Sequence, residues 1–246
     1  YIIYKNPELK NTAKKEGVHG LLNWEGPIMT DSGTFQSHVY GEIDMQPNEI
    51  LNFQKKIGVD IGTVLDVFCE PETRFEDAKK ELEETQKRIE ESDKNKDSIF
   101  LAAPIQGGRH LDLRLKAAQM ASKTNADLFP IGGVVPLMEK NNFKMLAEVI
   151  IASKKGLDTS KPVHLFGCGH PMLFALATFL GCDLFDSSSY AKFASRDSLM
   201  FTWGTRNLEE LEIIPSEFSA APGININELK AMQKKERQQI IATHNL

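Results

Sequence analysis

Fold and function both depend on one stretch of this sequence, Gly26-Pro27-Ile28-Met29-Thr30-Asp31-Ser32-Gly33-Thr34-Phe35-Gln36. A short apolar run there ends in a carboxylate, a hydroxyl and a glycine, which is typical of a strand whose tip takes part in chemistry. Gly33 permits a sharp turn or the close approach of a ligand, and Phe35 offers a flat face on which a planar ligand can stack. The same residues also suit an ordinary turn, so the remainder of the chain decides between the two interpretations.

Apolar segments of this kind recur along the chain and alternate with helical patterns, at intervals of about 30 residues, as in α/β folds. Seven strands are predicted, at residues 1–4, 27–29, 60–66, 98–106, 127–133, 162–169 and 183–188. Helices are predicted after Asn6 and after Gln46, and at residues 73–94, 110–123, 139–155, 170–180, 203–211 and 227–244.

A closed (β/α)8 barrel, the TIM barrel, needs one strand more than these seven. The chain opens inside an apolar run and without a methionine. We therefore expect part of a longer product that lacks the first barrel strand. The alternative is an open, doubly wound parallel sheet, which the lack of Gly-x-Gly-x-x-Gly after the first strand disfavours. We assign residues 1–214 to the barrel and 215–246 to a small C-terminal subdomain.

Composition narrows the classes of protein further. The net charge of −5 over 246 residues argues weakly against a large nucleic-acid footprint, which usually gives a basic domain. No apolar run approaches the roughly 20 residues of a membrane-spanning helix, so no membrane association is expected. Cys69, Cys168 and Cys182 are odd in number and form no Cys-x-x-Cys pair. They fit a reducing compartment, the cytoplasm, better than a disulfide framework.

Polar groups follow strand after strand. The predicted tips carry Asp31, Asp66, Gln106-Gly107, Gly132-Gly133, Gly167-Cys168-Gly169-His170 and Asp186. In a barrel these ends meet on one face, where active sites lie, and a turn interpretation does not require such a recurrence.

Two carboxylates on either side of a sugar carbon are the usual equipment for cleaving a glycosidic bond. Asp66 and Gln106 are able to pair with the edge of a heterocycle, because a carboxylate accepts hydrogen bonds and an amide both donates and accepts them. The residues alone therefore indicate glycosyl transfer or hydrolysis on a substrate with a planar, polar base. Each aspartate taken singly is as readily a helix cap or a salt-bridge partner.

Five ordered motifs resemble those of the tRNA-guanine transglycosylases, in particular the archaeal, archaeosine-forming branch. They are Met29-Thr30-Asp31-Ser32-Gly33-Thr34-Phe35-Gln36, Pro104-Ile105-Gln106-Gly107, Pro130-Ile131-Gly132-Gly133-Val134-Val135-Pro136-Leu137-Met138-Glu139, His164-Leu165-Phe166-Gly167-Cys168-Gly169-His170-Pro171 and Leu184-Phe185-Asp186-Ser187-Ser188-Ser189-Tyr190. The resemblance extends from Tyr1 to about Ile214.

The resemblance implies a (β/α)8 barrel that exchanges guanine 15 in the D arm of tRNA for 7-cyano-7-deazaguanine (preQ0). Asp186 would be the nucleophile that forms a covalent bond to the ribose, and Asp31 the general acid and base. The residues that would bind the base are Ser32, Phe35, Asp66, Gln106, Gly107, Gly132, Gly133 and Val134. Among them Phe35 would stack on the base, and Ser32 would support the site.

The sequence departs from the family at its zinc site, which is Cys-x-Cys-x-x-Cys followed by a later histidine. Ser216, Phe218 and Ala221 stand at the cysteine positions, and only His244 matches a ligand. A structural zinc needs four ligands, so we predict no zinc and no other cofactor. The last helix is then expected to pack by apolar contacts alone, through Leu229, Met232, Ile240 and Ile241.

The expected partners are tRNA and a 7-deazaguanine base. Lys192, Arg196 and Arg206 are the candidates for contacts to tRNA phosphates. Archaeal members usually append RNA-binding domains, so we expect a homodimer or a heteromer with a subunit that carries them. The alternatives are a non-catalytic RNA-binding or scaffolding subunit, motivated by the degenerate zinc site, and a transglycosylase for another deazaguanine or for DNA.

Overall fold

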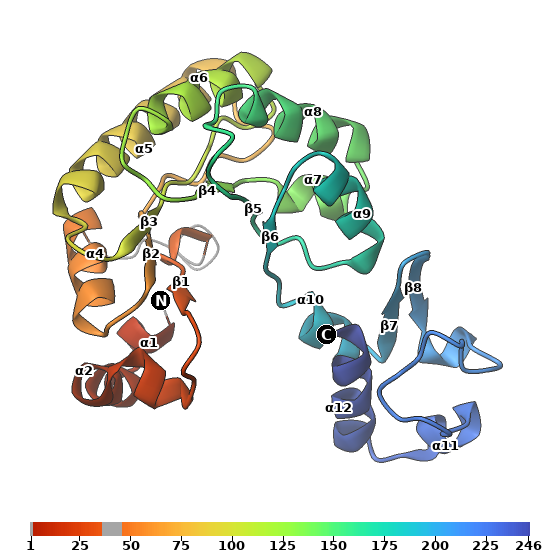
Figure 1. Cartoon of the computed structure of the whole chain (residues 1–246). Helices are drawn as coiled ribbons and strands as arrows, with labels where there is room; N and C mark the ends of the chain where they lie inside the picture. Colours follow the sequence, from red (N-terminus) through yellow and green to blue (C-terminus); the bar gives the residue numbers. More distant parts are fainter. Residues whose placement is uncertain (1, 36–45) are drawn as a thin grey trace. The chain divides into compact units, whose positions relative to one another are not determined.

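The structure is a computed structural model that describes residues 2–35 and 46–246. Tyr1 and Gln36, which belong to predicted segments, lie outside the described residues. The chain divides into two compact units, Tyr1–Phe166 and Gly167–Leu246, and each is described by itself (Figure 1). The predicted boundary between residues 214 and 215 falls inside the second unit and stays a prediction.

Parallel strands form the centre of the first unit. They are β1 (Met29–Thr30), β2 (Ile61–Thr63), β3 (Phe100–Ala102), β4 (Phe129–Ile131) and β5 (Val163–Leu165). β1, β2 and β3 are neighbours in one sheet, and β4 pairs with β5. Isolated parallel bridges, Ala102 to Leu128 and Ile105 to Ile131, connect the two sets. The five predicted strands at these positions are confirmed.

Helices precede and connect the strands of the first unit. They are α2 (Pro7–Leu22), α4 (Pro47–Lys56), α5 (Phe75–Asn95), α6 (Leu111–Ala121), α7 (Val135–Glu139) and α8 (Phe143–Lys154). Figure 1 shows α4, α5, α6 and α8 in succession along the outer side of the strands. Asn6 caps α2 as predicted, because its side chain accepts the backbone N–H groups of Glu8 and Leu9.

The core of the first unit lies between these helices and the strands. Strand residues such as Leu101, Ile131 and Leu165 are completely buried, and so are Val149 and Ile150 of α8. This burial on both faces explains why the strands read as continuous apolar runs rather than as alternating patterns.

The predicted strand at residues 1–4 is wrong, because Ile2–Lys5 is a helical turn, α1. Its aromatic side chain packs against helices: the Tyr4 ring meets the edge of Phe53 at 5.1 Å, and Lys10 Nζ lies 3.5 Å from the centre of the Tyr4 ring. A four-residue apolar run does not distinguish a strand from a buried helical turn by its pattern.

The second unit begins with a helix, α9 (Pro171–Phe179), and a short strand, β6 (Leu184–Phe185), both as predicted. It continues with α10 (Ser189–Ala194), β7 (Ser198–Phe201), β8 (Gly204–Asn207), a 3-10 turn at Leu208–Glu210, α11 (Ile226–Ala231) and α12 (Lys234–Asn245). The single helix predicted at residues 227–244 is therefore two helices.

β7 and β8 form an antiparallel hairpin, so the helix predicted at residues 203–211 is wrong. Met200 pairs with Thr205, and Gly204 has a φ of 138°, which few other residues adopt. The chain reverses at Thr202–Trp203 and continues antiparallel to β7 from Gly204, the first residue of β8.

Apolar side chains of both terminal helices close the core of the second unit. Phe201, Phe218, Leu229 and Ile241 are buried there, and Met232 and Ile240 pack against them.

The expectation of apolar contacts alone is wrong, because polar groups also attach the last helix. The buried Asn245 side chain accepts the N–H of Met200 and donates to the carbonyl groups of Tyr190 and Ser198. Arg237 donates to both carboxylate oxygens of Asp197, at 3.0 and 2.9 Å. The last helix therefore needs specific hydrogen-bond partners as well as an apolar face.

An α/β fold with parallel strands is thus confirmed, whereas closure into a (β/α)8 barrel stays a prediction. Among the described residues, no helix has the length and apolar character to cross a membrane.

Candidate active site

Asp66 and Gln106 lie at the tips of two neighbouring strands, β2 and β3, and contact each other. Gln106 Nε2 donates to Asp66 Oδ2 at 2.6 Å, and both side chains are buried. Burial raises the pKa of the Asp66 carboxyl, the charge of Asp31 adds to the rise, and hydrogen bonds from Thr34 and Gln106 oppose it. This carboxyl is therefore costly to ionise and is held by specific donors.

The loop that carries Asp66 is fixed by the helix behind it. Arg88 of α5 donates to the carbonyl oxygens of Leu65 and Asp66, at 3.2 and 3.3 Å. Glu84, one turn earlier, accepts from Arg88 Nε at 2.8 Å. The main chain at Asp66 is thus held in place by hydrogen bonds from α5.

The opening stretch, which follows β1, faces the same loop. Thr34 Oγ1 donates to the Asp66 carbonyl oxygen at 3.3 Å and pairs with the buried Ser32 hydroxyl at 3.1 Å. Asp31 is exposed, and its charge reaches Asp66. Phe35, 40% exposed, meets the edge of Phe68 at a ring distance of 5.7 Å. The Phe35 ring is therefore partly exposed, on the same stretch as Asp31.

Glycines at the tip of β4 leave room for the Gln106 side chain. A Cβ on Gly132 would lie 2.5 Å from Gln106 Nε2, and one on Gly133 would collide with the carbonyl of Cys69 and lie 2.9 Å from Gln106 Oε1. Gly133 also has a φ of 68°. Gln106 Oε1 is buried and has no hydrogen-bond partner among the described residues. Only glycine fits here, and an acceptor is left for a ligand or a neighbour.

In the second unit, Asp186 follows β6 directly and is exposed. Its Oδ1 accepts the backbone N–H of Gly167 at 3.0 Å, which fixes the direction of the carboxylate. The next residue, Ser187, packs so closely on Gly169 that a Cβ at Gly169 would collide with it. A glycine-rich turn therefore positions Asp186.

His170 closes the same turn. Its Nδ1 accepts the N–H of Met172 and caps α9, and its Nε2 lies 2.8 Å from Thr205 Oγ1. Burial lowers the pKa of the His170 imidazole. With Nδ1 as acceptor, a neutral ring carries its hydrogen on Nε2 and donates it to Thr205.

The structure thus brings together the predicted residues of the first unit, and separately the Asp186 turn of the second. Gly107 and the buried Val134 belong to the first group, on the loops after β3 and β4. Lys192, Arg196 and Arg206 are exposed on the second unit, and the Arg206 guanidinium lies 4.9 Å from the centre of the Trp203 ring.

A sequence model of the family described as queuine tRNA-ribosyltransferase matches residues 1–246. The chain belongs to this family.

Named relatives of this queuine tRNA-ribosyltransferase family member agree with that assignment. The tRNA-guanine(15) transglycosylases of Methanocaldococcus jannaschii and Thermoplasma acidophilum are each 47% identical to it, over 253 and 246 aligned positions. That of Methanococcus vannielii is 45% identical over 253 positions. In each case the alignment covers 100% of this chain and 39% of the relative. The resemblance seen in the motifs is confirmed, and the chain spans about two fifths of the length of these relatives.

In this chain, the residues at the zinc-ligand positions of the queuine tRNA-ribosyltransferase family do not suit a metal ion. Phe218, at one cysteine position, lies against the His244 ring at 4.9 Å, and Phe201 lies against it at 5.0 Å. Burial lowers the pKa of the His244 imidazole. Ser216 and Ala221 complete the set, so no thiolate is available at these positions. Within residues 2–35 and 46–246, no group of three or more His, Cys, Asp or Glu side chains suits a metal ion.

The sequence interpretation missed three supporting residues of this site, namely Thr34, Arg88 and Arg114, the last of which donates to the carbonyl oxygens of Ile105 and Gly132. Arg114 had a detectable signal, because it occupies the same helical face as Ala117, Ala118 and Ala121, where a charged residue is unusual. Thr34 and Arg88 act through backbone carbonyl groups, and nothing in their sequence context indicates that.

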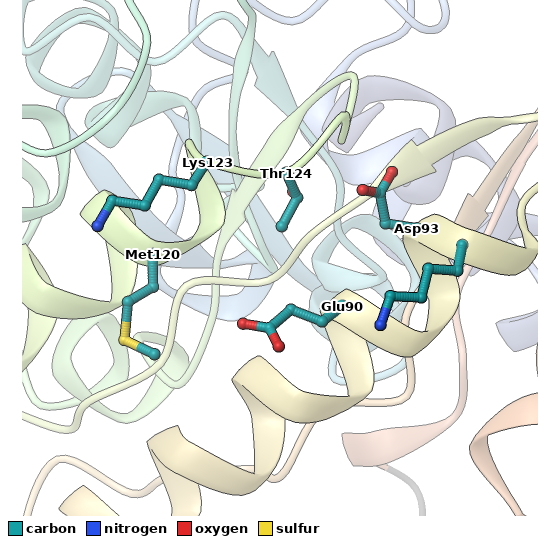
Figure 2. A pocket seen from close by; sticks show the side chains of 6 residues that line it. Glu90, Asp93, Met120, Lys123 and Thr124 are labelled. Atoms are coloured by element: carbon teal, nitrogen blue, oxygen red, sulfur yellow. The ribbon is translucent and has the colours of Figure 1, made fainter.

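A hollow of about 420 Å³ lies between α5 and α6, away from the strand tips (Figure 2). It is lined by Glu90, Asp93, Lys94, Met120, Lys123 and Thr124. Asp93 accepts the N–H of Asn125, which precedes β4. The hollow therefore lies near the amino ends of the strands, opposite the candidate active site.

Proposed function

We propose that this chain carries the catalytic part of a tRNA-guanine(15) transglycosylase. It would exchange guanine 15 in the D arm of tRNA for preQ0, without cleaving the strand. One observation carries the proposal: the buried Asp66–Gln106 pair lies within electrostatic reach of Asp31, in a chain whose relatives bear this name.

Base recognition follows from the hydrogen-bonding capacity of these groups. The Asp66 carboxylate accepts from the N1–H and N2–H groups that guanine and preQ0 share, and the Gln106 amide faces the O6 atom. The backbone after Gly132, near Gly133 and Val134, reaches the other side of the base. Phe35 stacks on its plane, and Ser32 holds the Thr34 hydroxyl in place.

The chemistry is a double displacement on the ribose. The Asp186 carboxylate attacks C1′, the bond from C1′ to N9 of guanine breaks, and Asp31 gives its proton to the departing base. Asp31 then takes the N9 proton of preQ0, which attacks C1′ and releases Asp186. The proton that Asp31 gives in the first half is regained in the second.

A closed (β/α)8 barrel is part of the proposal, because it brings the carboxyl ends of all strands, including Asp31 and Asp186, to one face. The succession of parallel strands with helices on their outer side supports it. The C-terminal subdomain, residues 215–246, is proposed to fold without zinc.

The partners of this chain are proposed as well. Lys192, Arg196 and Arg206 would contact tRNA phosphates, which their exposure supports. A homodimer, or a heteromer with a subunit that carries RNA-binding domains, would complete the tRNA-binding surface. Native mass spectrometry of the full protein with and without tRNA tests this assembly.

Incorporation of labelled guanine into archaeal tRNA tests the activity. We expect the label to enter a tRNA with guanine 15, to be displaced by unlabelled preQ0, and not to enter a tRNA in which residue 15 is adenine. Absence of incorporation by the complete assembly would overturn the activity.

The degenerate zinc positions favour one alternative, a non-catalytic RNA-binding or scaffolding subunit. In that case the chain would bind tRNA and raise the exchange rate of an active partner, and would incorporate no label by itself. Substituting Asp31 in this chain would then leave the rate of the complex unchanged.

A further inference from the structure

Arg114 is a charged side chain that the proposed mechanism does not use. It lies near the start of α6 (Leu111–Ala121), and its side chain is completely buried. Burial lowers the pKa of its guanidinium to about 10, so the group still carries its positive charge at neutral pH. Burying a charged group is unfavourable unless it is well hydrogen-bonded, and its bonds therefore indicate its role.

Within the described part of the chain, it makes three hydrogen bonds, all to backbone carbonyl groups of the loops after β3 and β4. Arg114 Nε donates to Gly108 O at 2.8 Å, and Nη1 donates to Ile105 O at 2.7 Å and to Gly132 O at 2.9 Å. Ile105 and Gly108 stand on either side of Gln106-Gly107. One rigid, planar group thus joins the loop after β3 to the loop after β4.

Two buried polar atoms beside this clamp have no hydrogen-bond partner among the described residues. They are Arg114 Nη2, a donor, and Gln106 Oε1, an acceptor. Both lie against Gly133: a Cβ placed there would be 3.5 Å from Arg114 Nη2 and 2.9 Å from Gln106 Oε1. The positive charge is therefore on the Oε1 side of the Gln106 amide, and Asp66 is on its Nε2 side.

We propose that Arg114 is a positioning residue of the base pocket, which fixes the spacing of the two loops and holds the Gln106 amide with its NH2 group toward Asp66 and the base. The inference rests on the proposed function and deepens it. An amide oxygen is drawn toward a cation, so the guanidinium disfavours the flipped amide. The flipped amide would present an acceptor to O6 of guanine, which is itself an acceptor.

Arg114→Lys tests the inference, since it keeps the charge but removes the planar fork that reaches three carbonyl groups. We expect the KM for guanine in the exchange reaction to rise about tenfold or more, with kcat changed by less than threefold. The dissociation constant of free guanine, measured without tRNA, should rise by the same factor. An arginine with a purely structural role would lower the Tm and leave both constants within twofold of the wild type, which would overturn the proposal.

A double substitution shows whether Arg114 acts through Gln106. In the Gln106→Ala background, Arg114→Lys should raise the KM for guanine by a clearly smaller factor than in the wild type, because the amide that it orients is absent and only the loop spacing is affected. Equal factors in both backgrounds would contradict this route. Arg237→Lys is the matched control: Arg237 also donates to backbone carbonyl groups, those of Lys230 and Met232, but in the second unit. It should leave the KM for guanine unchanged.

Gln106→Glu in the Asp66→Asn background is the second test, used if Arg114→Lys does not fold. Asp66→Asn removes the carboxylate that lies 2.6 Å from the Gln106 side chain, so the charge of Arg114 is the one that faces the new carboxylate, and the Tm should equal or exceed that of Gln106→Ala in the same background. A Tm more than about 5 °C lower, some 1–2 kcal/mol for a chain of this size, would mean that no cation compensates the new charge and would overturn the proposal. If the wild type binds free guanine but exchanges none, the proposed function fails while the binding measurements still test Arg114.

Discussion

Gln106 Nε2 lies 2.6 Å from Asp66 Oδ2, and this bond joins the tips of two neighbouring strands. The Asp66 carboxyl is buried, and its burial raises its pKa. The free energy of burying this carboxylate is part of the folding equilibrium, so its effect on stability is measurable as a function of pH.

Replacement of Asp66 by asparagine is expected to stabilise the empty protein and to abolish binding of guanine. Burial raises the pKa of Asp66 in the folded state above its unfolded value. Below the unfolded pKa the carboxyl is neutral in both states, and its burial cost appears as the pH rises through the folded pKa. The gain in Tm of Asp66→Asn over the wild type should therefore grow from pH 4 to neutral pH, as recorded by thermal melts.

Asp158→Asn is the control, because its effect on the Tm should change with pH in the opposite direction. Hydrogen bonds from the backbone N–H and the hydroxyl of Ser160 lower the pKa of Asp158. The stability that this carboxylate contributes is present above its unfolded pKa and is lost as the pH falls. A Tm difference for Asp66→Asn that does not change with pH would contradict the expected cost.

Asp186→Asn should reduce guanine exchange by at least about 1,000-fold, the scale on which enzymes lose activity without a covalent nucleophile. The backbone N–H of Gly167 is still able to bond to the asparagine oxygen, so the Tm should change little. Denaturing gels of protein incubated with tRNA should show a covalent adduct for the wild type and none for the variant. Asp183→Asn, three residues earlier and also exposed, should keep the exchange rate within twofold. An undiminished rate in Asp186→Asn would remove Asp186 from the mechanism.

Gly169→Ala should destabilise the second unit and impair exchange together, because the added Cβ collides with Ser187 next to Asp186. Overpacking of this kind costs about 1–3 kcal/mol, measurable by urea unfolding. The double variant with Ser187→Gly removes the opposing side chain and should recover most of the lost stability. If stability is not recovered, the contact between residues 169 and 187 is not the cause of the destabilisation.

Removal of metal ions should leave the second unit intact. A chelator such as EDTA is expected to leave the Tm unchanged, because Ser216, Phe218 and Ala221 supply no thiolate at the cysteine positions of the family. Phe218→Ala should cost about 3 kcal/mol, since Phe218 is buried against His244. Ser216→Ala, at another of these positions but exposed, should change stability by less than about 0.5 kcal/mol. A fall in Tm on chelation would contradict a metal-free subdomain.

The strand tips were predictable from sequence, because a buried parallel strand is a continuous apolar run and its end is marked by a change to polar residues and glycine. Asp66 and Gln106 follow such runs, and their contact follows from the neighbouring positions of β2 and β3. Their place at one edge follows from the rule that parallel strands share an edge, whereas the hydrogen bond between their side chains was not predicted.

Two segments were not predictable, for different reasons. The apolar residues at Ile2–Lys5 are too few to show a period, and their helical form depends on packing against Phe53, about 50 positions later. The hairpin at residues 198–207 depends on the φ of Gly204, which sequence does not state. Arg114 is a third case: its helical face was visible, but its three carbonyl partners come from two loops that only the fold brings together.

Asn245 bonds to Tyr190, Ser198 and Met200 across 55, 47 and 45 positions of the chain. Contacts between such distant positions require a large loop to close before they contribute any free energy. The β7–β8 hairpin is therefore not expected to form without the last helix. We expect the second unit to fold in a single slow step that includes its last helix, so that deletion of the final turn should abolish the hairpin and not merely fray the helix.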